Sequence, residues 1–240
     1  MTTFFFGDIK TAFAKEQFYG IKNSQELLSQ PEFIKMQKQL SFNTTLKAFI
    51  TVHQTHSVHG LIIKNLDEAI SYTPYSQEAD FIITNVPHIA IAVATADCLP
   101  IIFYDAKKQV IAIAHAGWQG SVAGIASKVV HAMHAEFGVE YNDIQIIFGP
   151  CASVDAYEVG ADFGNNIVGL EKKDFDEVFI QQNGTHYFNL PLYNQRLLEQ
   201  IGVQNFNYEH NHCTITNHAY CSHRRERGLA KRQISFALLY

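Results

Sequence analysis

Short apolar runs separated by polar turns dominate the chain between residues 46 and 114. Their lengths and their content of β-branched and aromatic residues are typical of β-strands. We expect six such strands, at residues 46–53, 57–66, 80–84, 89–94, 99–104 and 110–114. The second should pair with the first, with Gly60 as a possible bulge, and the polar residues 105–109 should form a hairpin turn.

Other segments show the three- and four-residue spacing of amphipathic helices. The clearest is 121–137, where Ser121 can act as the N-cap. Its buried face is predicted to consist of Val122, Ile125, Val129 and Met133. We expect further helices at 24–40 and 190–201, and further strands at 144–148 and 232–239.

Strands and helices interleave along the chain, and some neighbouring strands are joined by hairpins. This order predicts an α/β or α+β sandwich with a mixed β-sheet and flanking helices. The sequence contains no internal repeat, low-complexity segment or Pro/Gly-rich linker. We therefore expect residues 1–240 to form a single catalytic domain.

Composition narrows the class of protein. The chain has 240 residues, of which 47% are hydrophobic and 17% charged, and its net charge is −5. Such a chain can bury a large core and lacks the broad basic face that nucleic-acid binding needs. The start of the chain does not resemble a signal peptide, and the apolar runs are shorter than the roughly 20 residues that span a bilayer. We expect a cytoplasmic monomer with no membrane partner and with four reduced cysteines.

The candidate chemistry lies where apolar runs end. His56, Cys98 and His115 each sit at the end of a strand-like run or in the turn beside it. Strand ends are where an α/β fold assembles its active site. One thiolate and two imidazoles can hold zinc and leave a fourth position open, as in catalytic zinc sites. Taken singly, Cys98 could equally be a small buried hydrophobe and each histidine a solvent-facing side chain.

A glycine turn follows the third of these residues. Gly117 and Gly120 let the backbone pass close to a ligand or metal, and the helix start after them could bind an anion such as phosphate. Neither standard phosphate-loop pattern is present. The alternative is an ordinary, tightly packed helix start.

Six motifs occur in one order along the chain. They are Q-T-H at 54–56, A-D-C-L-P-I at 96–101, H-A-G-W-Q-G at 115–120, G-P-C at 149–151, Y-E-V at 157–159 and S-H-R-R at 222–225. Together they resemble the bacterial YfiH/YlmD family, also called laccase-domain or polyphenol oxidase proteins. The resemblance covers roughly residues 45–240.

The resemblance implies a YfiH-like fold and a zinc ion held by His56, Cys98 and His115. It also implies phosphorolysis of adenosine, inosine, guanosine and methylthioadenosine, with some adenosine deamination. The family usually carries R-x-G-G-x-S near its start, whereas residues 12–20 here read AFAKEQFYG. If that segment grips the substrate, the substrate range or rate of this protein differs from the family's.

For phosphorolysis, we assign phosphate to the zinc and the glycine turn, with Arg224 or Arg225 as a charge-assisted clamp. For deamination, a carboxylate must move the proton, and Asp97 and Glu158 are the candidates. Asp97 could instead orient a ligand histidine. Trp118 and Tyr157 could contact a base, although packing is the more common role for such residues.

Copper fits the sequence less well than zinc. A blue-copper centre commonly adds an axial methionine, and the three methionines of the chain are far from the three ligands in sequence. Two other interpretations stay open. Cys98 and His115 could be the nucleophile and base of a metal-free cysteine hydrolase or amidase, which would have little need of His56. The chain could also be a metal-carrying binding module without activity.

Overall fold

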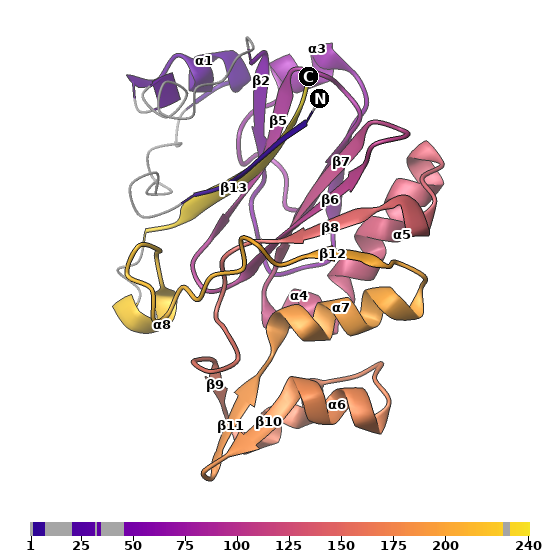
Figure 1. Cartoon of the computed structure of the whole chain (residues 1–240). Helices are drawn as coiled ribbons and strands as arrows, with labels where there is room; N and C mark the ends of the chain where they lie inside the picture. Colours follow the sequence, from indigo (N-terminus) through magenta and orange to yellow (C-terminus); the bar gives the residue numbers. More distant parts are fainter. Residues whose placement is uncertain (1, 8–20, 32, 35–45, 228–230) are drawn as a thin grey trace.

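Two β-sheets packed face to face form the body of the molecule (Figure 1). The computed structural model describes residues 2–7, 21–31, 33–34, 46–227 and 231–240. The four-stranded sheet has the order β1-β13-β5-β2 and consists of β1 (Thr2–Phe6), β13 (Gln233–Leu239), β5 (Ile89–Thr95) and β2 (Ala48–Thr51). The six-stranded sheet has the order β12-β8-β6-β7-β4-β3 and consists of β12 (Asn205–Asn207), β8 (Gln145–Phe148), β6 (Leu99–Asp105), β7 (Val110–Ala116), β4 (Phe81–Thr84) and β3 (Gly60–Ile63).

A smaller three-stranded sheet, of order β10-β11-β9, lies at one end of the body (Figure 1). Its strands are β9 (Glu158–Val159), β10 (Phe179–Gln182) and β11 (Thr185–Phe188). The helices are α1 (Ser24–Leu28), α3 (Leu66–Ser71), α4 (Trp118–Val122), α5 (Ile125–Phe137), α6 (Lys172–Val178), α7 (Leu190–Gln200) and α8 (His223–Glu226), with short 3-10 helices at Tyr141–Asp143 and Ala161–Asn166. Parallel and antiparallel strand pairs with flanking helices make this an α+β fold, as the sequence predicts.

Side chains along the central strands point alternately to the two faces of the sheet, and they form one apolar layer on each face. In β6, Ile101 and Phe103 face the helices, whereas Ile102 faces the four-stranded sheet. In β7, Ile111 and Ile113 meet Ile102 in the layer between the sheets. Successive side chains of a strand point to opposite faces, so these strands bury both faces and read as continuous apolar runs.

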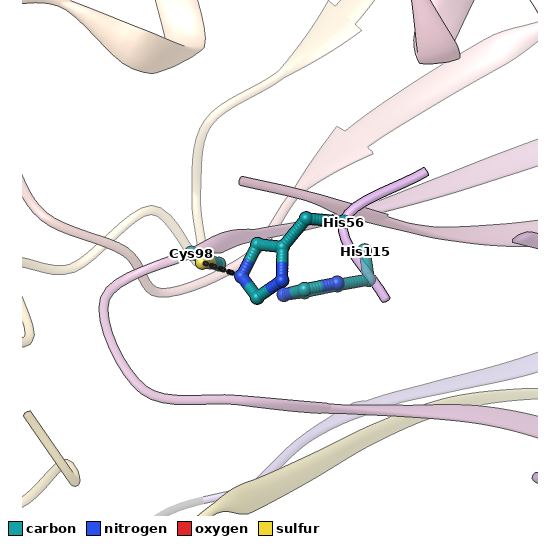
Figure 2. Close-up of side chains that lie close together, drawn as sticks. All are labelled: His56, Cys98 and His115. Atoms are coloured by element: carbon teal, nitrogen blue, oxygen red, sulfur yellow. Dashed lines mark hydrogen bonds between the residues drawn. The ribbon is translucent and has the colours of Figure 1, made fainter. Parts of the chain in front are cut away.

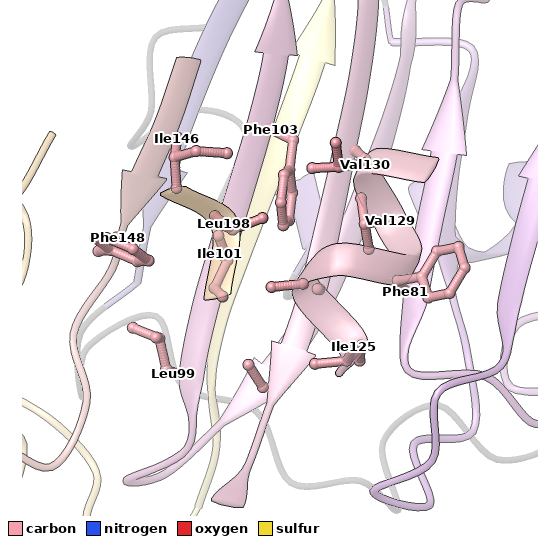
Figure 3. Packing of buried hydrophobic residues seen from close by; sticks show 14 of the residues in the cluster. Phe81, Leu99, Ile101, Phe103, Ile125, Val129, Val130, Ile146, Phe148 and Leu198 are labelled. Carbon is pink, nitrogen blue, oxygen red and sulfur yellow. The ribbon is translucent and has the colours of Figure 1, made fainter. Parts of the chain in front are cut away.

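Helices cover the outer faces of both sheets. Ile125 and Val129 of α5 pack on the six-stranded sheet, in the same cluster as Leu198 of α7 (Figure 3). Met133 of α5 belongs to this cluster as well. On the other side, Leu27 of α1 packs on the four-stranded sheet. The molecule is thus a sandwich of two sheets between helical layers, and its termini lie close together because β1 pairs with β13.

The predicted helix 121–137 is interrupted. Gly124 adopts a left-handed backbone with φ of 81°, which separates α4 from α5. The N-cap of α4 is Gly117, so the prediction of Ser121 as N-cap is wrong. Ser121 is buried inside α4, and its hydroxyl accepts a hydrogen bond of 3.0 Å from Asn194 Nδ2.

The prediction that 57–66 pairs with the preceding strand is also wrong. The strand shortens to β3 and pairs in parallel with β4, in the other sheet from β2. Gly60 is not a bulge but a point of close approach, because a Cβ there would lie 2.0 Å from Cε2 of Phe81. The ring of Phe81 therefore occupies the space that a side chain would need.

Other predictions hold, with shifted ends. β6 and β7 form the expected hairpin, and α7 begins at the expected residue with Asn189 as its cap. Of the helix expected at 24–40, α1 covers Ser24–Leu28, residues 31, 33 and 34 are again helical, and residues 32 and 35–40 lie outside the described residues. All four cysteines are free thiols. In the part of the chain that the structure describes, no helix is long and apolar enough to cross a bilayer.

Candidate metal centre and cavity

Three separate segments bring His56, Cys98 and His115 together (Figure 2). His56 lies in the loop between β2 and β3, Cys98 in the turn that joins β5 to β6, and His115 near the end of β7. That turn crosses from one sheet to the other, so the group lies where the two sheets meet. The possible ligand atoms of the three residues all lie within 4.8 Å of one another.

The backbone of two loops is bent to reach this arrangement. His56 has a φ of 61° and Asp97, beside Cys98, has a φ of 78°. Residues other than glycine adopt this left-handed conformation rarely, and it clusters at functional sites. It is held here by hydrogen bonds to two buried or half-buried carboxylates, Asp80 and Asp97.

Asp80 is the residue of the site that sequence reasoning missed. Its carboxylate is fully buried just before β4, and it accepts a hydrogen bond of 2.8 Å from Nδ1 of His115. It also accepts hydrogen bonds from the backbone N–H groups of Thr55, His56 and Ser57. Its place at the start of an apolar strand-like run, two residues after Glu78, does not distinguish it from an ordinary carboxylate at a strand end.

Charge pairing decides the protonation of these groups. Burial opposes ionisation of the Cys98 thiol, but the charges and hydrogen bonds of His115 and His56 lower its pKa to about 6. Burial likewise disfavours the charged form of His115, but Cys98 and Asp80 raise its pKa to about 9. Burial would raise the pKa of Asp80, but hydrogen bonds from His115 and Ser57 hold it well below its ordinary value. The thiolate that results at Cys98 is the form that binds metals.

Gly117 is required by the geometry of the group. A Cβ at this position would lie 2.8 Å from Cδ2 of His56 and 3.1 Å from the sulfur of Cys98. A Cβ at Gly120 would lie 3.2 Å from the backbone oxygen of Ser57. Both predicted glycines thus allow close approach of the backbone to the loop that carries His56.

The donor set fits a zinc ion. Bonds of about 2.3 Å to sulfur and about 2.1 Å to nitrogen place two ligand atoms of a tetrahedral site about 3.6 Å apart. The sulfur of Cys98 and Nε2 of His56 are 3.8 Å apart. Since Nδ1 of His115 is engaged by Asp80, its Nε2 is the nitrogen left for a metal. Three ligands leave one tetrahedral position for water or substrate.

A cavity of about 460 Å³ adjoins this group. A cavity of this size can take a nucleoside-sized ligand. Its lining combines the three candidate ligands with aromatic and cationic side chains, including Tyr75, Trp118, Tyr157, His223, Arg224 and Arg232. Trp118 also contacts the ring of Phe163, so it serves both the cavity and the packing.

The two predicted arginines have different surroundings. Arg224 lines the cavity, with its guanidinium 5.6 Å from the ring centre of Tyr157 and one N–H donated to the backbone oxygen of Glu158. The guanidinium of Arg225 instead donates to the backbone oxygens of Thr214, Ile215 and Tyr220. Arg225 thus holds the loop before α8 together, and only Arg224 of this pair lines the cavity.

The two predicted proton-transfer carboxylates differ as well. Asp97 lines the cavity and accepts hydrogen bonds from Thr214 Oγ1 at 2.6 Å, from Ser222 Oγ at 3.1 Å and from the backbone N–H of Arg224 at 2.7 Å. These hydrogen bonds include none to a candidate ligand histidine, whereas Asp80 accepts one from His115. Glu158 is exposed and is not among the lining residues.

Comparison with known proteins identifies the family. A family model described as multi-copper polyphenol oxidoreductase laccase matches residues 29–240. Purine nucleoside phosphorylase YlmD of Bacillus subtilis (strain 168) is 29% identical over 217 residues, which cover 81% of this chain and 72% of YlmD. Adenosine deaminase RL5, from an unknown prokaryotic organism, is 29% identical over 201 residues, which cover 79% of this chain and 74% of that protein.

The fold has a close counterpart among solved structures. The crystal structure of the hypothetical protein YfiH of Bacillus licheniformis matches with a TM-score of 0.80 at 27% identity, covering 100% of this chain and 93% of that one. The expectation of a YfiH-like fold is confirmed. Since the family model spans most of the sequence and the structural match spans all of it, the chain belongs to the polyphenol oxidoreductase laccase family that is represented by YfiH-like and YlmD-like proteins.

Proposed function

We propose that this protein is a zinc-dependent purine nucleoside phosphorylase with adenosine deamination as a side activity. The observation that carries the proposal is the meeting of His56, Cys98, His115 and Arg224 in the lining of one cavity. A metal-ligand group beside a guanidinium suits a reaction between an anion and a small polar molecule. Relatives named purine nucleoside phosphorylase and adenosine deaminase support the two reactions.

We propose zinc as the metal. His56, Cys98 and His115 would hold it, and it would supply a Lewis acid that orients a phosphate oxygen or lowers the pKa of water. Among the described residues, this is the one group of three potential ligands, whereas an electron relay to oxygen needs further copper sites. Met133 lies in the apolar core, and Met1 and Met36 lie outside the described residues. The donor set therefore favours zinc over copper.

In phosphorolysis, a phosphate oxygen bonds to C1′ of the ribose while the bond from C1′ to the purine nitrogen breaks. The products are ribose 1-phosphate and the free base. The guanidinium of Arg224 would bind and orient the phosphate, since it is the member of the predicted pair that lines the cavity. Tyr157 and Trp118 supply aromatic surface for the purine in the same cavity.

In deamination, water replaces the amino group of adenosine, and a proton must pass from the water to the departing ammonia. Asp97 is the only carboxylate among the described residues that line the cavity, so we assign it this proton transfer. Glu158 is the weaker candidate because its side chain lies outside that lining. The substrates we propose are adenosine, inosine, guanosine and methylthioadenosine.

The competing interpretations find less support. A cysteine hydrolase would need only Cys98 and His115, yet His56 lies in contact with the same sulfur. A metal-carrying module without activity would not need a cavity of about 460 Å³ next to the metal ligands. Two of the relatives described above, YlmD and RL5, are named as nucleoside enzymes, which also favours the phosphorylase.

Product analysis tests the proposal. Zinc-loaded protein is incubated with inosine or adenosine, with and without phosphate, and the products are separated by chromatography. We expect free base and ribose 1-phosphate only when phosphate is present, together with some inosine from adenosine. If adenosine is deaminated but no sugar phosphate forms from any purine nucleoside, phosphorolysis is excluded and the deaminase remains.

A further inference from the structure

We propose that Asp80 is the positioning residue of this metal site, because its single buried carboxylate fixes the donor atoms of both His56 and His115. The inference rests on the proposed metal site and adds a residue that holds two of its three ligands. Asp80 lies directly before β4, which pairs with β7 in the six-stranded sheet. This position places it beside His115 of β7. It does not line the cavity, so it acts through the histidines and not on the substrate.

The contact with His115 fixes the ring of that residue. Nδ1 of His115 lies 2.8 Å from Oδ1 of Asp80, and both side chains are buried. The backbone N–H of His115 also donates to the backbone oxygen of Asp80 at 2.7 Å. A carboxylate that accepts from Nδ1 places the ring proton there and leaves the Nε2 lone pair for a metal.

The contacts with residues 55–57 fix the second ligand. Oδ2 of Asp80 accepts from the backbone N–H groups of Thr55 and Ser57 at 3.1 and 2.6 Å, and Oδ1 accepts from that of His56 at 3.1 Å. The hydroxyl of Ser57 adds a fourth bond of 2.8 Å. Three successive N–H groups that converge on one carboxylate explain why His56 keeps a left-handed backbone at this point.

The pattern of donors requires a carboxylate and not an amide. Both oxygens of Asp80 face only donors among the contacts described: backbone N–H groups, hydroxyls and Nδ1 of His115. An asparagine at this position keeps nearly the same shape but replaces one acceptor with an NH₂ group. In either orientation, that NH₂ group would meet N–H donors of the 55–57 loop, of His115, or of both.

The test is the zinc affinity of Asp80→Asn, with Asp105→Asn as the matched control. Asp105 is also fully buried, and its Oδ1 accepts from the backbone N–H groups of Lys107 and Lys108 at 2.7 and 2.8 Å. It lies at the opposite end of β6 from Cys98, roughly 20 Å away along the strand. Each variant therefore loses a buried carboxylate that accepts hydrogen bonds from backbone N–H groups, but only Asp80 lies beside the candidate metal ligands.

Metal-free wild type and variants are titrated with zinc in competition with a coloured chelator, and their thermal unfolding is recorded without metal. We expect Asp80→Asn to weaken zinc binding about 10- to 100-fold, and Asp105→Asn to keep the wild-type affinity even where it lowers the unfolding temperature. Ser57→Ala removes one donor to Asp80 and should weaken zinc binding in the same direction by less. This milder variant decides the matter if Asp80→Asn does not fold.

Wild-type zinc affinity in folded Asp80→Asn, or in Ser57→Ala where Asp80→Asn does not fold, would overturn the role of Asp80 and leave the proposed function standing. Equal weakening in Asp80→Asn and Asp105→Asn would also overturn it, because the loss would then follow from general destabilisation. A wild-type protein that binds no zinc would instead overturn the metal site itself, and this inference with it.

Discussion

At the scale of single residues, the surroundings of Cys98 set the chemistry of its sulfur. The thiol lies beside the imidazoles of His56 and His115, whose rings are 4.7 Å apart between centres. Burial favours the neutral thiol, but the two histidines outweigh it and lower the pKa to about 6. Above that pH, the metal-free protein holds a thiolate ready to bind a metal or to react.

This pKa predicts how fast Cys98 reacts with iodoacetamide. Only the thiolate reacts, so the rate in metal-free protein should rise with pH and reach half its maximum near pH 6. Cys151 is the internal control, because burial raises its pKa to about 12 and it should stay unmodified in folded protein. Mass spectrometry of peptides after timed labelling separates the two. A half-maximum near pH 9, the ordinary value of a thiol, would show that the histidines do not stabilise the thiolate.

The sequence could predict the three candidate ligands but not Asp80, which accepts hydrogen bonds from two of them. His56, Cys98 and His115 could be found because each interrupts or ends an apolar run. Asp80 could not, since its partners are backbone N–H groups 23 to 25 residues earlier and a histidine 35 residues later. Such contacts depend on how loops and strands that are distant in sequence meet in space. The local pattern of apolar and polar residues does not determine this arrangement.

At the scale of elements, the two arginines that are adjacent in α8, Arg224 and Arg225, have different surroundings. Successive residues of a helix project about 100° apart, and in α8 His223 and Arg224 line the cavity whereas Arg225 does not. Arg224 stacks near Tyr157 in the cavity lining, whereas Arg225 binds three backbone oxygens and Glu226. The sequence left the choice between them open because it does not fix the rotation of the helix.

Replacing each arginine by alanine should therefore give different defects. Arg224→Ala removes a charge-assisted contact worth about 1.5–3 kcal/mol, so the KM for phosphate should rise roughly tenfold or more. Arg225→Ala should leave that KM unchanged and lower the free energy of unfolding, because three backbone oxygens lose their donor. Steady-state kinetics with varied phosphate and denaturant unfolding measure the two effects. If neither change alters the KM for phosphate, the phosphate position is wrong.

Errors in the predicted elements have local and long-range causes. The helix 121–137 breaks because Gly124 takes a left-handed backbone, which a helical pattern of apolar residues does not reveal. The strand at 57–66 joins the six-stranded sheet because its partner is β4, about 20 residues later in the chain, and not β2. By contrast, the β6–β7 hairpin was predictable because its turn and both strands are contiguous.

At the scale of the whole molecule, the site depends on the junction of the two sheets. β5 belongs to one sheet and β6 to the other, and the turn between them carries Asp97 and Cys98. The fold class was predictable from interleaved strands and helices, but the division of the strands between two sheets was not. The candidate metal ligands therefore come together only when the two sheets are correctly packed.

The most direct test of the account is elemental analysis of the purified protein, made without added metal, beside His56→Ala. The wild type should contain about one zinc per chain and little copper, because one thiolate and two imidazoles form the group. His56→Ala should fold, lose most of its zinc and lose nucleoside cleavage together with it. Stoichiometric copper without zinc, or a metal-free His56→Ala that keeps near-native turnover, would contradict the account.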